Sequence, residues 1–101
     1  MPTHVAVVDK KATITLEGRL DHSIGQGFRE GYESLLSRPG IAEIEIDLGG
    51  ADYIDSSVLG YFLILRERAG QAKIKVCLVN SQGIVETLLK IAGFERLFTM
   101  R

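Results

Sequence analysis

The sequence predicts a single α/β domain with a small mixed β-sheet and helices packed mainly on one of its faces. The chain has 101 residues, of which 46% are apolar and 25% are charged, the usual composition of one globular domain. Strand-like segments alternate apolar and polar residues, and this alternation predicts that only one face of the sheet is covered. Helix-like segments follow the middle strands, so we expect the order β-β-α-β-α-β-α-β over residues 1–101.

Hydrophobic periodicity defines each expected helix and strand. The elements are, in order, strands at 5–8 and 12–17, a helix at 23–37, a strand at 44–48, a helix at 57–69, a strand at 74–79, a helix at 81–92 and a short strand at 97–100. In 12–17 and 44–48 apolar residues occupy every second position, as in half-buried strands. In 23–37 they fall on one helical stripe, and Asp21 or Ser23 can cap the start.

Glycines and one polar segment indicate where elements are connected, weakened or ended. The segment "GGADYID", residues 49–55, is expected to be a loop that leads into the second helix. Gly25, Gly27 and Gly31 each weaken the first helix by up to ~1 kcal/mol relative to Ala, and close packing of that helix on the sheet can explain them. Gly93 is expected to form the C-terminal cap of the last helix.

Composition and charge exclude several classes of partner and cofactor. The net charge is −1 and no basic stripe is present, so we expect neither nucleic acid nor membrane as a partner. The longest apolar run, 61–65, is far shorter than the ~20 residues that span a bilayer. Cys77 stands alone in an apolar strand, so we expect a buried residue and no disulfide, metal or cofactor. Because no export signal is visible, a cytoplasmic protein is expected.

The segment "YIDSSVLG", residues 53–60, places a carboxylate and two hydroxyls at the start of the second helix. One of Asp55, Ser56 and Ser57 is expected to cap that helix through its side chain. The apolar residues of 58–65 then occupy nearly the whole circumference of the helix, where a helix on one face of a sheet needs only a stripe. We therefore expect an exposed apolar docking surface beside the serines.

The serines are poor candidates for catalysis by the chain itself. A nucleophilic serine needs a base, usually a histidine held by a third group, and only His22 is placed to serve. An enzyme that uses Ser56 with His22 or Asp21 is the least favoured hypothesis, because no nucleophile elbow or phosphate-binding loop is present. We expect no enzyme activity and interpret the serine as a phosphate acceptor, since a helix N-terminus accommodates a phosphate.

Three segments of the sequence resemble a known family over nearly the whole chain. "GRLDHSIGQGFREGYESLL" followed by "IEIDLGGADYIDSSVLGYFLIL" resembles the STAS domain of bacterial anti-sigma factor antagonists, and the similarity continues through "KVCLVNSQGIVETLLKIAGFERLF". The resemblance implies a sheet with helices on one side and a cytoplasmic protein that switches partners. In this family a kinase of the histidine-kinase ATP fold phosphorylates the serine after the Asp, and a PP2C-type phosphatase removes the phosphate.

The resemblance also implies roles for individual residues. Ser56 matches the phosphorylation site, Ser57 caps or supports the helix, and Asp55 shapes the loop before it. Asp21 matches a family aspartate that lies close to the phosphorylated serine. Val58 stands where the family commonly has Gly, and its bulk is expected to alter partner choice.

These observations leave two functional hypotheses in front. In the first, the unphosphorylated protein binds a kinase or anti-sigma-like regulator, and phosphorylation of Ser56 releases it. The residues expected to contact this partner are Tyr53, Val58, Leu59, Tyr61 and Ile64. In the second, the chain is a stand-alone STAS subunit of a lipid-transport ABC complex or a signalling scaffold, in which the same helix docks permanently.

Overall fold

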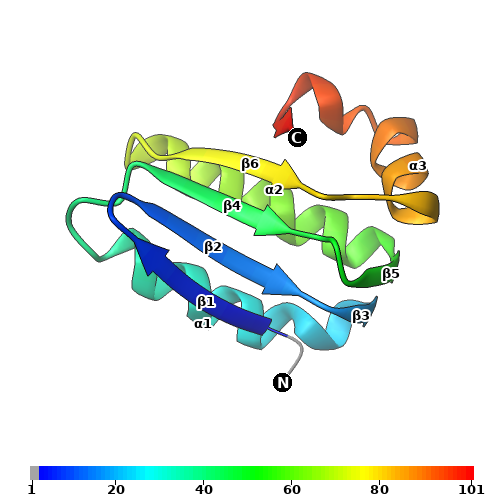
Figure 1. Ribbon diagram of the computed structural model, residues 1–101, viewed down its shortest axis with the longest axis horizontal. Coiled ribbons are helices and arrows are strands. Elements are labelled where there is room, and N and C mark those ends of the chain that lie inside the picture. The colour runs from blue at the N-terminus through cyan, green and yellow to red at the C-terminus, as the bar shows by residue number, and fades with distance from the viewer. Residues whose placement is uncertain (1–2) are drawn as a thin grey trace.

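A five-stranded mixed sheet, covered on one face by two helices, forms the centre of the structure (Figure 1). The computed structural model describes residues 3–101, so the first two residues of the expected domain lie outside the described part. The strands of this sheet, in spatial order, are β1 (Thr3–Val8), β2 (Lys11–Leu16), β4 (Glu43–Asp47), β6 (Lys75–Val79) and β7 (Thr99–Met100). Only the β1–β2 pair is antiparallel, and the other three pairs are parallel. The predicted fold class is confirmed.

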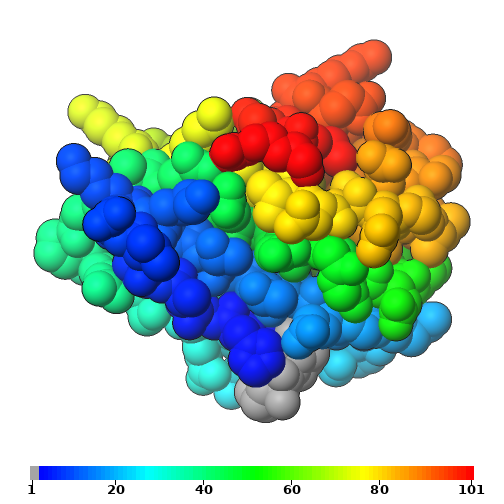
Figure 2. Space-filling model, in the orientation of Figure 1, coloured from blue at the N-terminus to red at the C-terminus, as the bar shows by residue number. Residues whose placement is uncertain are grey.

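The alternation in the strands places the core on one side of the sheet, as expected. The fully buried apolar residues of β2, β4 and the residue that follows β4 are Ala12, Ile14, Leu16, Ile44, Ile46 and Leu48. Their polar neighbours point to the opposite face. Figure 2 shows that face toward the viewer, and within residues 3–101 no helix lies across β1, β2 or β4 there. One face of the sheet therefore carries the hydrophobic core and the other is polar.

Two long helices lie side by side against the core face. The helical elements are η1 (His22–Ile24), α1 (Gly25–Leu36), α2 (Ser56–Gln71), α3 (Gly83–Ile91) and η2 (Phe94–Arg96). Figure 1 shows α1 and α2 behind the sheet, whereas α3 lies beyond the end of β6 and next to β5. Phe28 of α1 and Phe62 of α2 are both fully buried, with their ring centroids 5.6 Å apart. This aromatic contact joins the two helices to one core.

A second, two-stranded sheet was not expected. Strand β3 (Gly18–Leu20) pairs in parallel with β5 (Ala51–Ile54), so the prediction of a loop over 49–55 is wrong. Leu20 and Ile54 are buried, and this burial stabilises strands that are too short for any periodicity to be visible in the sequence. Gly18, at φ 81°, allows the turn that carries the chain from β2 into β3.

Close packing explains two of the three glycines in the first helix. A Cβ atom at Gly25 would lie 2.7 Å from Cζ of Tyr61, and one at Gly31 would lie 3.2 Å from Cγ2 of Val5. The expected packing on the sheet is found at Gly31, whose neighbour Val5 belongs to β1, whereas Gly25 packs against Tyr61 of α2. Gly93, at φ 76°, adopts the left-handed conformation just after α3, as expected for its C-terminal cap.

Candidate functional site

The parallel pair β3–β5 brings two aspartates to the same edge of the structure. Leu20, the last residue of β3, is the register partner of Ile54, the last residue of β5. The backbone N–H of Asp55 donates to the backbone oxygen of Leu20 at 3.2 Å. Asp21 and Asp55 each follow these paired residues, so their positions are fixed by the small sheet that the sequence did not reveal. The edge also carries Ser56, which begins α2.

Asp55 is the N-cap of α2. Its backbone is extended, with φ −109° and ψ 178°, and its side-chain oxygen accepts a hydrogen bond from the N–H of Val58 at 3.1 Å. The expectation that one of the three polar residues caps the helix is confirmed for Asp55. Of the two roles expected for Ser57, the capping role is wrong, because Ser57 is already the second residue of the helix, and the supporting role stays a prediction. Ser57 is half-buried in the first turn.

Ser56 is exposed at the first position of a 16-residue helix. The first N–H groups of an α-helix have no partner within the helix, and the helix dipole makes this end favourable for negative charge. Within residues 3–101 the Ser56 hydroxyl takes part in no side-chain hydrogen bond. A group attached to its Oγ therefore meets solvent on one side and the helix N-terminus on the other.

Asp21 is held as a charged cap by its own neighbour. Its carboxylate accepts hydrogen bonds from the backbone N–H of Ser23 at 2.9 Å and from the Ser23 hydroxyl at 2.5 Å. The hydroxyl bond is the main cause that lowers the pKa of Asp21 below its ordinary value, and the backbone bond adds to it. The N-cap of η1 is thus Asp21, one of the two expected candidates. These hydrogen bonds therefore favour the ionised form of the Asp21 carboxyl.

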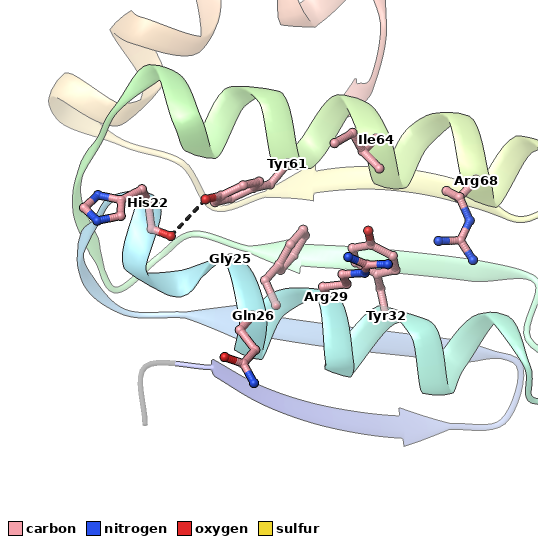
Figure 3. A pocket seen from close by; sticks show the side chains of 9 residues that line it. His22, Gly25, Gln26, Arg29, Tyr32, Tyr61, Ile64 and Arg68 are labelled. Atoms are coloured by element: carbon pink, nitrogen blue, oxygen red, sulfur yellow. Dashed lines mark hydrogen bonds between the residues drawn. The ribbon is translucent and has the colours of Figure 1, made fainter.

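The histidine and carboxylates do not assemble a nucleophile and base around Ser56. Among the described residues, Ser56 makes no hydrogen bond to either His22 or Asp21, whose carboxylate is engaged by Ser23. The backbone oxygen of His22 accepts a bond from the Tyr61 hydroxyl at 2.9 Å, and Figure 3 shows the imidazole directed away from that contact. No cluster of metal-ligating side chains occurs in the chain from residue 3 onward.

The apolar circumference of α2 is divided between core and surface. Val58, Phe62 and Leu65 are fully buried, whereas Ile64 is 52% exposed and Leu63 is 39% exposed. α2 therefore exposes apolar residues, as the sequence indicated, but Leu63 and Ile64 lie farther along the helix than the serines. Val58 was expected to contact a partner, but its side chain belongs to the core stripe and cannot reach one. Its effect on partner choice through direct contact is excluded in this conformation.

A groove runs from the phosphate-acceptor candidate to the last turn of α3. We name it the α2–α3 groove; it has a volume of about 420 Å³. The residues that shape it are Tyr53, Asp55, Ser56, Leu59, Leu88 and Ile91. Ile91 is 77% exposed, and Leu59 is half-buried. Leu88 is half-buried and packs against the core, whereas the exposed Ile91 is a surface residue that the sequence did not single out.

Tyr53 and Tyr61 lie at opposite sides of the α2 N-terminus and each has a specific neighbour. The guanidinium carbon of Arg19 lies 4.5 Å from the centroid of the Tyr53 ring, which is cation–π geometry. Tyr61 packs over Gly25 and donates to His22 across the gap between α1 and α2. Both residues are half-buried.

Within the described part of the chain, no helix is both long and apolar enough to cross a bilayer.

Comparison with known proteins gives one family and one fold. The family model described as the STAS domain matches residues 4–101. A STAS-domain containing protein of Pseudomonas aeruginosa strain UCBPP-PA14 is 38% identical over 89 residues, which cover 88% of this chain and 86% of that protein.

Solved structures share the fold at much lower identity. The anti-sigma factor antagonist SpoIIAA in its unphosphorylated form superimposes with a TM-score of 0.79 at 20% identity, over 98% of this chain and 86% of that one. The phosphorylated form of the same Bacillus protein gives a TM-score of 0.76 at 17% identity, over 98% and 90%. An anti-sigma factor antagonist from Mycobacterium paratuberculosis gives a TM-score of 0.83 at 16% identity, over 97% and 82%.

Proposed function

Because the chain belongs to the STAS domain family, we propose that it is a partner-switching regulator of the anti-sigma factor antagonist type. The unphosphorylated protein binds a kinase or anti-sigma-like regulator in the cytoplasm, and phosphorylation of Ser56 releases it. A kinase of the histidine-kinase ATP fold adds the phosphate and a PP2C-type phosphatase removes it. The protein is thus the substrate of these enzymes and has no catalysis of its own. The observation that carries the proposal is the exposed Ser56 at the start of α2.

The local electrostatics explain how one phosphate can act as a switch. A phosphoserine adds about −1.5 to −2 charges at neutral pH. The helix N-terminus tolerates this charge, so the fold need not change. Asp55 and Asp21 already make this edge acidic, and the phosphate adds further negative charge. A partner whose surface fits the unmodified Ser56 hydroxyl is then repelled. Phosphorylation is therefore expected to weaken binding without unfolding the domain.

The α2–α3 groove gives the partner an apolar surface next to the switch. Leu59 and Tyr53, both expected partner contacts, lie on its wall or rim, and Ile91 extends it. Tyr61 and Ile64 lie farther along α2, on the side that faces α1. A partner that covers Ser56 and the groove buries apolar side chains that are otherwise exposed, which is the usual source of binding free energy.

One structural neighbour supports the proposal, because it is a protein of the same fold that carries a phosphate in one of its structures. SpoIIAA is described as an anti-sigma factor antagonist and has structures in both phosphorylated and unphosphorylated forms, each of which aligns with nearly all of this chain. The likeness to SpoIIAA concerns the fold. The role of Ser56 in this chain is the part of the proposal that needs an experiment.

Phosphate mapping tests the proposal directly. The wild-type protein and the variants Ser56→Ala and Ser57→Ala are incubated with ATP and an extract of the cells that make the protein, and phosphopeptides are mapped by mass spectrometry. We expect phosphate on residue 56 in the wild type and in Ser57→Ala, and none in Ser56→Ala. Phosphate incorporation that is unchanged in Ser56→Ala would reject the assignment. The matched serine variant controls for loss of a neighbouring hydroxyl.

A pull-down separates the switch from a permanent structural role. The wild-type protein should retain a kinase or anti-sigma-like regulator, and Ser56→Asp should retain at least tenfold less, a loss that corresponds to about 1.4 kcal/mol. Equal recovery of a transport ATPase by both proteins would instead favour the stand-alone subunit of a lipid-transport ABC complex. In that role the apolar side chains of α2 and α3 are covered permanently.

A further inference from the structure

A second hollow lies on the other side of α2, away from Ser56. We name it the α1–α2 pocket; its volume is about 510 Å³ and it lies between the two long helices (Figure 3). The residues that the argument uses are Gly25, Phe28, Arg29, Tyr32, Ile64 and Arg68. Pockets of 300–1,000 Å³ with a mostly apolar lining and few polar groups are typical of small-molecule sites.

The two ends of the α1–α2 pocket are closed by contacts between the helices. At one end Tyr61 packs against Gly25, where any side chain would collide with the ring, and its hydroxyl donates to the backbone oxygen of His22 at 2.9 Å. At the other end Arg68 of α2 forms a hydrogen-bonded ion pair with Glu33 of α1. The helices are thus fixed relative to each other at both ends of the hollow.

The floor of the α1–α2 pocket is aromatic and firmly packed. Phe28 and Tyr32 are buried, and their rings meet edge to face with centroids 5.4 Å apart. Phe28 also contacts Phe62 of the core, so its ring cannot move aside without disturbing that core. Ile64 forms part of the wall, and its apolar side chain is 52% exposed to solvent. This floor and wall suit an apolar body.

The charge at the pocket is positive. Arg29 and Arg68 both line it, and no carboxylate does. Arg68 is matched by Glu33, whereas Arg29 forms no ion pair among residues 3–101. Arg29 is exposed, so its guanidinium can turn toward a bound molecule at little cost. Glu33 attracts Arg29 electrostatically, but its carboxylate is hydrogen-bonded to Arg68, so two arginines share one carboxylate and the edge of the apolar floor keeps a net positive charge.

We propose that the α1–α2 pocket binds a small amphipathic organic anion, with an apolar body on the Phe28–Tyr32 floor and an acidic group on Arg29. The body covers Ile64, and the acidic group receives the charge-assisted hydrogen bonds of a guanidinium. A carboxylate or sulfonate on an aromatic or aliphatic body meets both requirements. This proposal does not depend on Ser56 or on phosphorylation.

A fluorescent probe of this chemistry tests the proposal. The probe 8-anilinonaphthalene-1-sulfonate carries one sulfonate on an apolar aromatic body and becomes fluorescent in a dry site. Titration of the full chain should give saturable binding of one probe per chain, and decanoate should displace it. N-Phenyl-1-naphthylamine has the same aromatic body without the sulfonate, and it should bind at least fivefold more weakly if Arg29 contributes a charged hydrogen bond.

Two pairs of variants locate the site. Arg29→Gln should weaken probe binding about fivefold, whereas Arg38→Gln, the same charge change at an exposed position beyond α1, should leave it unchanged. Ile64→Asp should weaken it more than tenfold, because it places a negative charge on the wall. Ile91→Asp makes the same change in the α2–α3 groove and should have no effect. Far-ultraviolet circular dichroism checks that each variant is folded.

The outcomes separate this proposal from nonspecific surface binding and from the phosphorylation switch. Binding that does not saturate, equal affinity for the uncharged probe, or equal weakening by Ile91→Asp would overturn it. If Ile64→Asp does not fold, the comparison of Arg29→Gln with Arg38→Gln decides, since both residues are exposed. Ser56→Ala should bind the probe as the wild type does, so failure of either proposal leaves the other tested by its own experiment.

Discussion

The α1–α2 pocket and the α2–α3 groove share one helix but differ in charge and in how their walls are held. The pocket has arginines at its edge and is closed by side-chain contacts between two helices. The groove has Asp55 and Ser56 at its edge, and its apolar walls end in the open surface of Ile91. The broad apolar circumference of α2 therefore contributes to two surfaces, one with arginines at its edge and one with Asp55 and Ser56 at its edge.

Position along α2 explains the difference. The N-terminal turn, with its cap Asp55, faces the groove, whereas Ile64 and Arg68, one turn apart, face α1. Between them the stripe of Val58, Phe62 and Leu65 enters the core. Leu63 and Ile64 lie outside this stripe and are exposed, so the apolar surface of α2 extends beyond what the core covers.

The largest expected effect comes from Gly25→Ala, which should open the closed end of the α1–α2 pocket. The new Cβ would lie 2.7 Å from the Tyr61 hydroxyl oxygen, so the ring must move and its bond to His22 is lost. We expect the free energy of unfolding to fall by about 1–3 kcal/mol, the usual cost of overpacking, despite the better helix propensity of Ala. Urea unfolding measures this change.

Gly60→Ala is the matched control for Gly25→Ala. Gly60 lies inside α2, and a Cβ there would meet nothing within 4 Å. Helix propensity then acts alone, so the variant should be more stable by up to ~1 kcal/mol. If both variants change stability in the same direction, Tyr61 does not seal the pocket as described.

The sequence predicted the main elements because their patterns are long and regular. Alternation in 12–17 and 44–48 indicated a sheet with one buried face, and the structure has β2 and β4 there with that face in the core. It did not predict β3 and β5, whose three and four residues give no readable period. These strands form because Leu20 and Ile54 become buried against the rest of the fold, and that is a tertiary effect.

The candidate site was predictable in composition but not in its division of roles. The segment of Asp55, Ser56 and Ser57 identified a helix start, yet three capping residues in a row do not reveal which one accepts the backbone bond. The burial of Val58 follows from which side of α2 meets the sheet, and no local pattern fixes that side when apolar residues surround the helix. The α1–α2 pocket was not predicted, because it depends on the approach of two helices.

An intermediate effect is expected for the cap that borders the α2–α3 groove. Asp55→Ala removes the acceptor for the N–H of Val58 and should lower the free energy of unfolding by about 1 kcal/mol. Asp55→Asn keeps an acceptor and should cost only a few tenths of that amount. Ser57→Ala, two residues after the cap, should leave the free energy of unfolding within about 0.5 kcal/mol of the wild-type value. Thermal and urea unfolding of the three variants provide the measurement.

The opposite ranking would contradict the assignment of the cap. A larger loss in Ser57→Ala than in Asp55→Ala would return the capping role to the serine. The Asp55 carboxylate would then line the groove without capping the helix.

The smallest expected effect concerns η1, the short turn whose His22 holds Tyr61 at the end of the α1–α2 pocket. Ser23→Ala removes the hydroxyl that most lowers the pKa of Asp21, so that pKa should rise toward its ordinary value. A carboxylate whose pKa is lowered on folding stabilises the protein above its unfolded pKa, near 4, and this contribution is lost as the pH falls through the folded pKa. The variant should therefore lose less stability than the wild type on acidification from pH 5.

Carbon-13 NMR titration of the Asp21 carboxyl measures the pKa, with Ser34→Ala as control because the Ser34 hydroxyl bonds a backbone oxygen and no carboxylate. An Asp21 pKa that is the same in Ser23→Ala and Ser34→Ala would show that the Ser23 hydroxyl does not hold this carboxylate, and η1 would then need another anchor for the Tyr61 contact.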